Sequence, residues 1–130
     1  ATEGWRFFSA GSSAPAPRYH ATMVAYGGKL YVYGGKAPGG SGTAMSDLWE
    51  FDPVTGDWYD LTGQTAAAGS DLTLARFGHT AVVEGGRMLV FGGHTGADLT
   101  PNSLLALHMA TLVWSTVPPL QATGESVPLS

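Results

Sequence analysis

One unit occurs twice in this sequence: two apolar segments, joined by a glycine-rich turn and closed by a glycine doublet. The copies span residues 21–35 and 78–93, and their doublets, Gly34-Gly35 and Gly92-Gly93, lie 58 residues apart. A repeat of about 50 residues is typical of propellers and solenoids, in which each copy is one supersecondary unit. This period constrains the fold more than any other feature of the chain.

Each repeat contains four segments with the composition of β-strands. We expect them at residues 20–26, 29–33, 47–51 and 57–60 in the first repeat, and at 79–84, 87–91, 103–108 and 112–116 in the second. The offset falls from 58 to 56 after the second strand, because the next loop is two residues shorter, and insertions confined to loops are expected of a structural repeat. A helix over residues 102–113 is an alternative on propensity alone, but the register with residues 46–57 outweighs it.

Two of these segments are uninterrupted apolar runs. Leu30–Tyr33 and Met88–Phe91 do not alternate between polar and apolar residues. Runs of this length are typical of strands that are covered on both faces. Sheets stacked face to face would supply that cover.

Composition excludes several classes of function. The chain of 130 residues is 44% hydrophobic and 12% charged, as expected of a globular domain. Its net charge of −4 leaves no electrostatic footprint for nucleic acid, and no apolar run is long enough for a membrane span. It has no cysteine, which excludes a disulfide, a thiol nucleophile and a thiolate metal site but leaves the cellular compartment open.

The two registered copies resemble the kelch repeat of β-propellers, over residues 15–61 and 74–117. The matching elements are Pro17, Arg18, Gly34, Gly35, Asp47, Leu48 and Trp58 in the first copy, and Arg76, His79, Gly92, Gly93, Asn102 and Trp114 in the second. One departure is visible: His20 lies one position earlier than His79 would require, so Ala21 occupies the matching place.

The resemblance implies an all-β fold with two four-stranded antiparallel blades of an incomplete propeller, the first strand of each blade being innermost. We expect one propeller segment over residues 1–130, made of these parts in order: the fourth strand of a preceding blade at 5–8, blade one at 18–61, blade two at 76–117 and a C-terminal loop at 118–130. The glycine doublets would let a neighbouring backbone or ring approach closely. Trp58 and Trp114 would be buried between blades, and His79 would be a hydrogen-bonded core residue.

Two blades cannot close a ring, since typical propellers have about four to eight. An unclosed pair would also leave large apolar faces exposed. We therefore expect further blades, from the rest of a longer chain or from partner subunits, with self-assembly as the second choice. The chain starts without an initiator methionine or a signal-peptide pattern, which favours a processed chain or an excerpt.

Strand direction alternates, so the loops sort onto two faces. The tight connections are at residues 27–28, 85–86, 53–56 and 109–111, and the long ones at 9–17, 36–46, 62–75, 94–102 and 118–127, with a helical turn at 65–68 as an alternative to loop. All the long connections fall on one face. Loops held by a rigid scaffold concentrate binding residues, so this face is the candidate recognition surface.

The residues we expect to bind a partner on that face are Arg18, Lys36, Asp71, Arg76, His94 and Asp98. Paired arginines suit carboxylate or phosphate groups. The competing interpretation is that each arginine binds loop carbonyls or stacks on an aromatic ring within its own blade, and that the two acids are solvated. The four histidines have no metal-binding spacing, and no nucleophile motif orders the Ser, His and Asp residues.

The sequence therefore predicts a noncatalytic module, without metal or cofactor, that binds a protein partner through its long-loop face. One alternative is a piece of a propeller enzyme similar to galactose oxidase, whose copper site relies on a thioether-linked cysteine and tyrosine. The absence of cysteine in this chain argues against that alternative. The other alternative is an architectural blade pair within a large complex.

Overall fold

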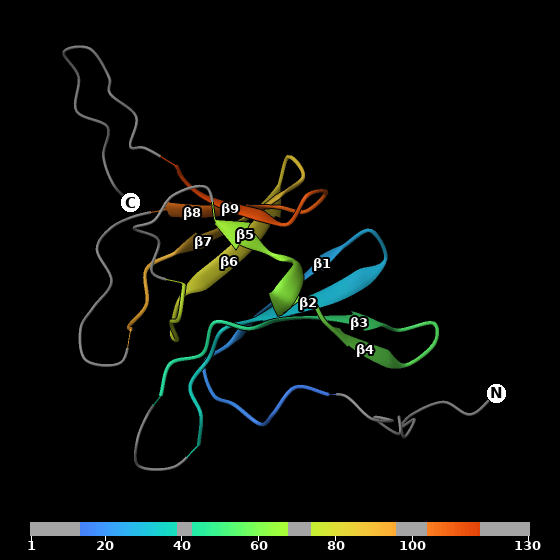
Figure 1. Cartoon of the computed structure of the whole chain (residues 1–130), viewed down its shortest axis with the longest axis horizontal. Coiled ribbons are helices and arrows are strands. Elements are labelled where there is room, and N and C mark those ends of the chain that lie inside the picture. The colour runs from blue at the N-terminus through green and yellow to red at the C-terminus, as the bar shows by residue number, and fades with distance from the viewer. Residues whose placement is uncertain (1–13, 39–42, 68–73, 96–103, 118–130) are drawn as a thin grey trace.

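Two β-sheets packed against each other form the molecule, seen in a computed structural model that describes residues 14–38, 43–67, 74–95 and 104–117 (Figure 1). The first sheet contains β1 (Thr22–Tyr26), β2 (Lys29–Tyr33), β3 (Leu48–Asp52) and β4 (Asp57–Asp60). The second contains β5 (Ala66–Ala67), β6 (Thr80–Glu84), β7 (Arg87–Phe91), β8 (Leu104–His108) and β9 (Val113–Val117). The fold class expected from the sequence, four-stranded antiparallel blades of an incomplete propeller, is confirmed.

Strand order follows the chain in each four-stranded antiparallel unit, and β5 is added at the outer edge of the second sheet, beside β9. The first sheet has the order β1-β2-β3-β4 and the second the order β5-β9-β8-β7-β6. The innermost strands β1 and β6 lie next to each other, so the two blades are neighbours around one axis. We call β1–β4 blade one and β6–β9 blade two. The predicted fourth strand at residues 5–8 lies outside the described residues, as does the C-terminal loop.

The connection between the blades differs from the loop expected at residues 62–75. A 3₁₀ turn, η1 (Thr62–Gln64), and the two-residue strand β5 occupy its first part, and no helical turn forms at residues 65–67. Thr62 anchors this segment, because its hydroxyl accepts a hydrogen bond from the Leu48 amide at 3.0 Å. The β5 strand then pairs in parallel with β9. The expectation was wrong because the outer edge of blade two offers unpaired backbone groups, which this short segment satisfies.

The core lies between the blades. It is formed by the buried side chains of Tyr31, Tyr33, Leu48, Met88, Val90, Leu105, Leu107, Met109 and Trp114. In β2, only alternate residues point into this layer, since successive strand residues face opposite sides of a sheet. We call this layer the junction. Trp114, 1% exposed, stacks at a tilt on Tyr33 of the other blade, with the ring centroids 4.8 Å apart.

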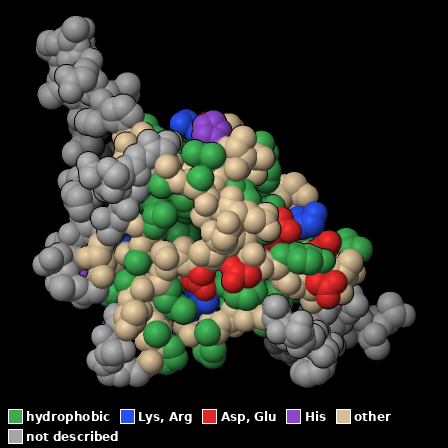
Figure 2. Space-filling view, viewed as in Figure 1, with side chains coloured by type: hydrophobic (Ala, Val, Ile, Leu, Met, Phe, Trp, Pro, Cys, Tyr) green, Lys and Arg blue, Asp and Glu red, His purple; other side chains and the backbone are tan. Residues whose placement is uncertain are grey.

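The outer faces of the two blades are partly exposed, as we expected of an unclosed pair, although Phe91 ends one of the two apolar runs that we expected to be covered on both faces. Val82 and Phe91 of blade two are 58% and 46% exposed, and Met23 of blade one is 60% exposed. Trp58, which we expected between blades, is only partly buried and packs on Phe51 of its own blade. Phe91 and Trp58 lack the expected cover because each blade has only one described neighbour. Figure 2 shows apolar side chains at the surface over both sheets.

Candidate functional site

The residues before each inner strand pair with the residues after the second strand. Tyr19 exchanges two backbone hydrogen bonds with Lys36, at 2.9 and 2.8 Å, and Phe77 does the same with His94, at 3.0 and 2.8 Å. These equivalent bridges extend the inner hairpin of each blade beyond its glycine doublet. They fix the backbone positions of Tyr19, Lys36, Phe77 and His94 relative to the inner hairpins.

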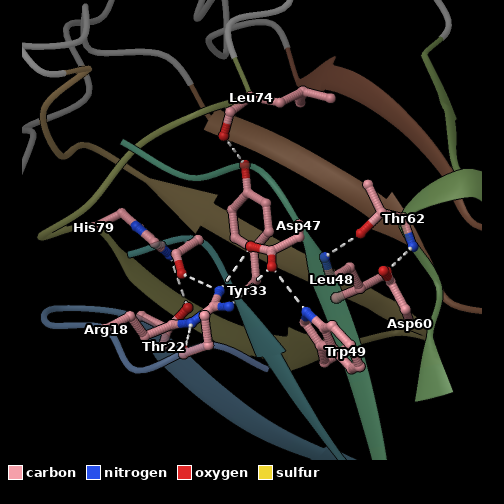
Figure 3. Close-up of polar contacts among 12 residues, drawn as sticks. Arg18, Thr22, Tyr33, Asp47, Leu48, Trp49, Asp60, Thr62, Leu74 and His79 are labelled. Atoms are coloured by element: carbon pink, nitrogen blue, oxygen red, sulfur yellow. Dashed lines mark hydrogen bonds and ion pairs between the residues drawn. The ribbon is translucent and has the colours of Figure 1, made fainter. Parts of the chain in front are cut away.

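Arg76 lies in the junction. Its side chain is buried, the whole residue being 1% exposed, and its Nη1 donates to the Gly92 carbonyl at 3.0 Å. Burial lowers the pKa of this guanidinium, while a hydrogen bond to the Tyr33 hydroxyl of blade one opposes that shift. The Tyr33 hydroxyl in turn donates to the Leu74 carbonyl, and burial raises its pKa (Figure 3). Arg76 therefore connects the two blades.

Arg18, its equivalent in blade one, is held within its own blade. It donates to the Gly34 carbonyl at 3.0 Å and pairs with both carboxylate oxygens of Asp47, at 2.6 and 2.9 Å. Trp49 Nε1 donates to the same carboxylate at 2.8 Å (Figure 3). Burial raises the pKa of Asp47, but the hydrogen bonds from Arg18 and Trp49 outweigh it and leave the pKa below its ordinary value.

Both arginines thus bind the carbonyl of the first glycine in their own doublet, which matches the competing interpretation of their role. Their guanidinium groups are committed to contacts inside the molecule. We therefore leave them out of the candidate binding surface. Asp71 and Asp98, the two acids expected beside them, lie outside the described residues.

His79 also lies in the junction. Its Nε2 is 2.8 Å from the Thr22 hydroxyl of blade one, and its ring makes an edge contact with Tyr33. Burial, reinforced by the positive charge of Arg76, lowers the pKa of His79 to about 4. The imidazole is therefore neutral near pH 7 and serves the packing of one blade on the other.

The ring of Phe77, itself partly buried, is the centre of a partly exposed cluster at the boundary of the blades. His94 stacks on this ring, with the centroids 5.4 Å apart and an interplanar angle of 14°. Lys36 Nζ lies 5.2 Å from the ring centroid, and the His20 ring lies 6.4 Å away on a third side. Tyr19, 54% exposed, follows next to His20. We call these five residues the Phe77 cluster.

Backbone contacts fix the two halves of the cluster relative to each other. The Gly78 amide of blade two donates to the His20 carbonyl of blade one at 3.0 Å. His20 has a φ of 57°, in the left-handed region that few residues other than glycine occupy. Such a conformation persists only where the surroundings hold it, and it often accompanies functional sites.

Lys36 and His94 were predicted from the sequence, whereas Tyr19, His20 and Phe77 were not. A signal was present: Tyr19 and Phe77 each follow the repeated arginine, and Lys36 and His94 each follow the glycine doublet. The cluster combines one cation, two imidazoles and two aromatic rings, which suits an acidic group beside an apolar one. Within the described ranges, no three His, Cys, Asp or Glu residues lie close enough to hold a metal ion.

Comparisons with known proteins agree with this architecture, in which radially arranged four-stranded sheets form part of a β-propeller. A family model described as the KLHDC2/KLHL20/DRC7 Kelch-repeats domain matches residues 1–126. The chain therefore belongs to the kelch-repeat family, whose domains commonly mediate protein–protein interaction. No helix in the described part of the chain is long and apolar enough to cross a membrane.

Three relatives illustrate the range of the family. Tip elongation aberrant protein 1 of Schizosaccharomyces pombe is 36% identical over 112 residues, which are 80% of this chain and 9% of that protein. The Rab9 effector protein with kelch motifs of Xenopus laevis is 32% identical over 72% of this chain and 24% of its own length. The N-(sulfonatooxy)prop-2-enimidothioate sulfolyase of Thlaspi arvense is 30% identical over 90% and 34%. The chain spans only about a tenth to a third of these relatives.

Proposed function

We propose that this chain is a noncatalytic protein-binding segment that engages its partner through the long-loop face, with the Phe77 cluster at the centre of the contact. The observation that carries the proposal is the arrangement of the cluster itself. A lysine and two imidazoles from both blades surround the Phe77 ring, and the exposed Tyr19 lies next to one of these imidazoles. Interfaces are enriched in aromatic residues, and a surface prepared in advance loses less entropy on binding.

The position of a lysine within the Phe77 cluster supports an acidic partner segment. The protein carries a net charge of −4, yet Lys36 stands over the Phe77 ring at the middle of the cluster. The described acidic residues nearest in sequence, such as Asp47, are engaged within the blade. A partner segment that combines a carboxylate with a neighbouring apolar side chain would match both features of the cluster.

A charge-reversal comparison tests this proposal. Lys36→Glu and Phe77→Ala chains would be used as immobilised bait beside the parent chain, and bound proteins would be quantified by mass spectrometry. For proteins that the parent chain enriches, we expect the bound amount to fall at least tenfold with either variant. The reason is that the loss of a hot-spot contact costs roughly 2 kcal/mol or more of binding free energy.

The matched control is Lys29→Glu. This substitution makes the same charge change at the first residue of β2, next to the tight turn at residues 27–28 and on the opposite face. It should leave binding unchanged, and all variants should keep the parent melting temperature to within a few degrees. Equal loss with Lys29→Glu would indicate a nonspecific charge effect, and undiminished binding by both cluster variants would contradict the proposal.

A further inference from the structure

The two outer faces of the molecule are repeat equivalents of the two halves of its junction. Blade one presents Met23, Ala25, Leu30, Val32, Trp49, Phe51 and Trp58 on its outer face, as the strand register shows. These positions correspond to Ala81, Val83, Met88, Val90, Leu105, Leu107 and Trp114, which blade two packs into the junction. Likewise, Phe91 on the outer face of blade two corresponds to Tyr33, which receives Trp114. Trp58 of one molecule could therefore pack on Phe91 of another.

The polar residues have changed in a matched way at these outer faces. In the junction, burial disfavours the charge of Arg76, and the Tyr33 hydroxyl of the other blade opposes that effect. At the outer faces, Arg18 is already paired with Asp47 in its own blade, and Phe91 has no hydroxyl to offer. The outer face of blade two thus lacks the hydroxyl that Tyr33 supplies in the junction, and Arg18 of blade one has a partner without it.

The second cross-blade hydrogen bond of the junction has lost only its histidine at the outer faces. In the junction, His79 meets the hydroxyl of Thr22. Ala21 takes the place of the histidine on blade one, whereas blade two keeps a threonine, Thr80, whose hydroxyl has the Phe91 carbonyl of its own blade at 3.5 Å. Neither Arg18 nor Thr80 would therefore need a hydrogen-bond partner from the opposite outer face.

We propose that the outer face of blade two docks on the outer face of blade one of a second copy of this chain, head to tail, as an apolar version of the junction. The residues exposed now would be covered: Met23, Val82 and Phe91. Head-to-tail contacts form a ring when the rotation between neighbouring copies closes. Each copy would contribute two blades, and propellers typically contain about four to eight blades. This proposal does not depend on the protein-binding role of the Phe77 cluster.

Light scattering on the purified chain, coupled to size-exclusion chromatography, tests the proposal. The parent chain should have a mass that is a small multiple of the monomer mass. Val82→Glu blocks one face and Met23→Glu the other, and each variant alone should be monomeric. Mixed in equal amounts, the two should form a 1:1 heterodimer, because each keeps the face that the other lacks.

Val54→Glu is the control, since Val54 is 85% exposed in the turn between β3 and β4, away from both outer faces. This variant should assemble as the parent chain does. A folded parent chain that stays monomeric at high concentration would overturn the proposal. So would a mixture of the two blocked variants that stays monomeric, or assembly that persists in either blocked variant alone.

Discussion

Gly34 and Gly92 occupy the same position in their repeats, but their surroundings are opposite. A methyl group added to Gly34 would lie 2.7 Å from both the Arg76 carbonyl oxygen and the His79 ring. One added to Gly92 would meet no atom within 4 Å among the described residues. Both residues have φ values in the left-handed region, 73° and 76°. Two separate reasons therefore favour glycine at this position. The left-handed backbone applies in both repeats, whereas the close approach of the neighbouring blade applies only at Gly34.

Alanine substitutions can separate these reasons, and here we expect the largest effect. Gly92→Ala should lower the free energy of unfolding by about 1–2 kcal/mol, the cost of a left-handed alanine. Gly34→Ala should lower it by roughly 2–4 kcal/mol, because overpacking against blade two adds to that strain. Urea unfolding in dilute solution measures both. Equal losses would mean that the neighbouring blade does not constrain Gly34.

The sequence predicted most of the fold because a repeat carries its own register. The offsets of 58 and 56 aligned all eight blade strands to within about two residues of their observed bounds. The pairing of Ala66–Ala67 with β9 could not be predicted, since two alanines carry no strand signal and the partner edge is defined only in three dimensions.

The candidate site was predicted less completely, again for a physical reason. Arg18 and Arg76 have the charge that a binding residue needs, and only the structure shows their guanidinium groups committed to carbonyls and to Asp47. Phe77 has no charge and looks like a core residue in the sequence. The role that we propose for it rests on the convergence of Lys36 and His94 on its ring, which two bridges between distant segments bring about.

A second test of the difference between the two repeats uses pH, because His79 in the junction has no equivalent histidine in blade one. His79 is neutral in the folded protein down to about pH 4, whereas an unfolded histidine binds a proton below about pH 6.5. The unfolded state therefore binds more protons in this window, and stability falls as the pH decreases from about 6.5 to 4. One histidine accounts for a loss of up to roughly 3 kcal/mol.

The measurement is the free energy of unfolding at pH 7, 6, 5 and 4.5 for the parent chain and for His79→Gln, which keeps a hydrogen-bonding group but does not titrate. The variant should show a clearly flatter dependence. His108→Gln, a substitution at an exposed position on the tight-turn side, should keep the parent slope. Parallel curves for the parent chain and His79→Gln would show that the junction does not hold this imidazole neutral.

The smallest expected effect is an energetic coupling between aromatic rings, and it is also the most decisive. It tests whether the two repeats pack on each other through the junction while their outer faces make no contact with each other within one molecule. The measurement is a double-mutant cycle for Tyr33→Ala and Trp114→Ala, compared with a cycle for Phe91→Ala and Trp58→Ala at concentrations where the chain is monomeric. The first pair should show a coupling free energy of about 0.5–1.5 kcal/mol, as stacked aromatic rings do, and the second pair none. Absence of coupling between Tyr33 and Trp114 would contradict the account.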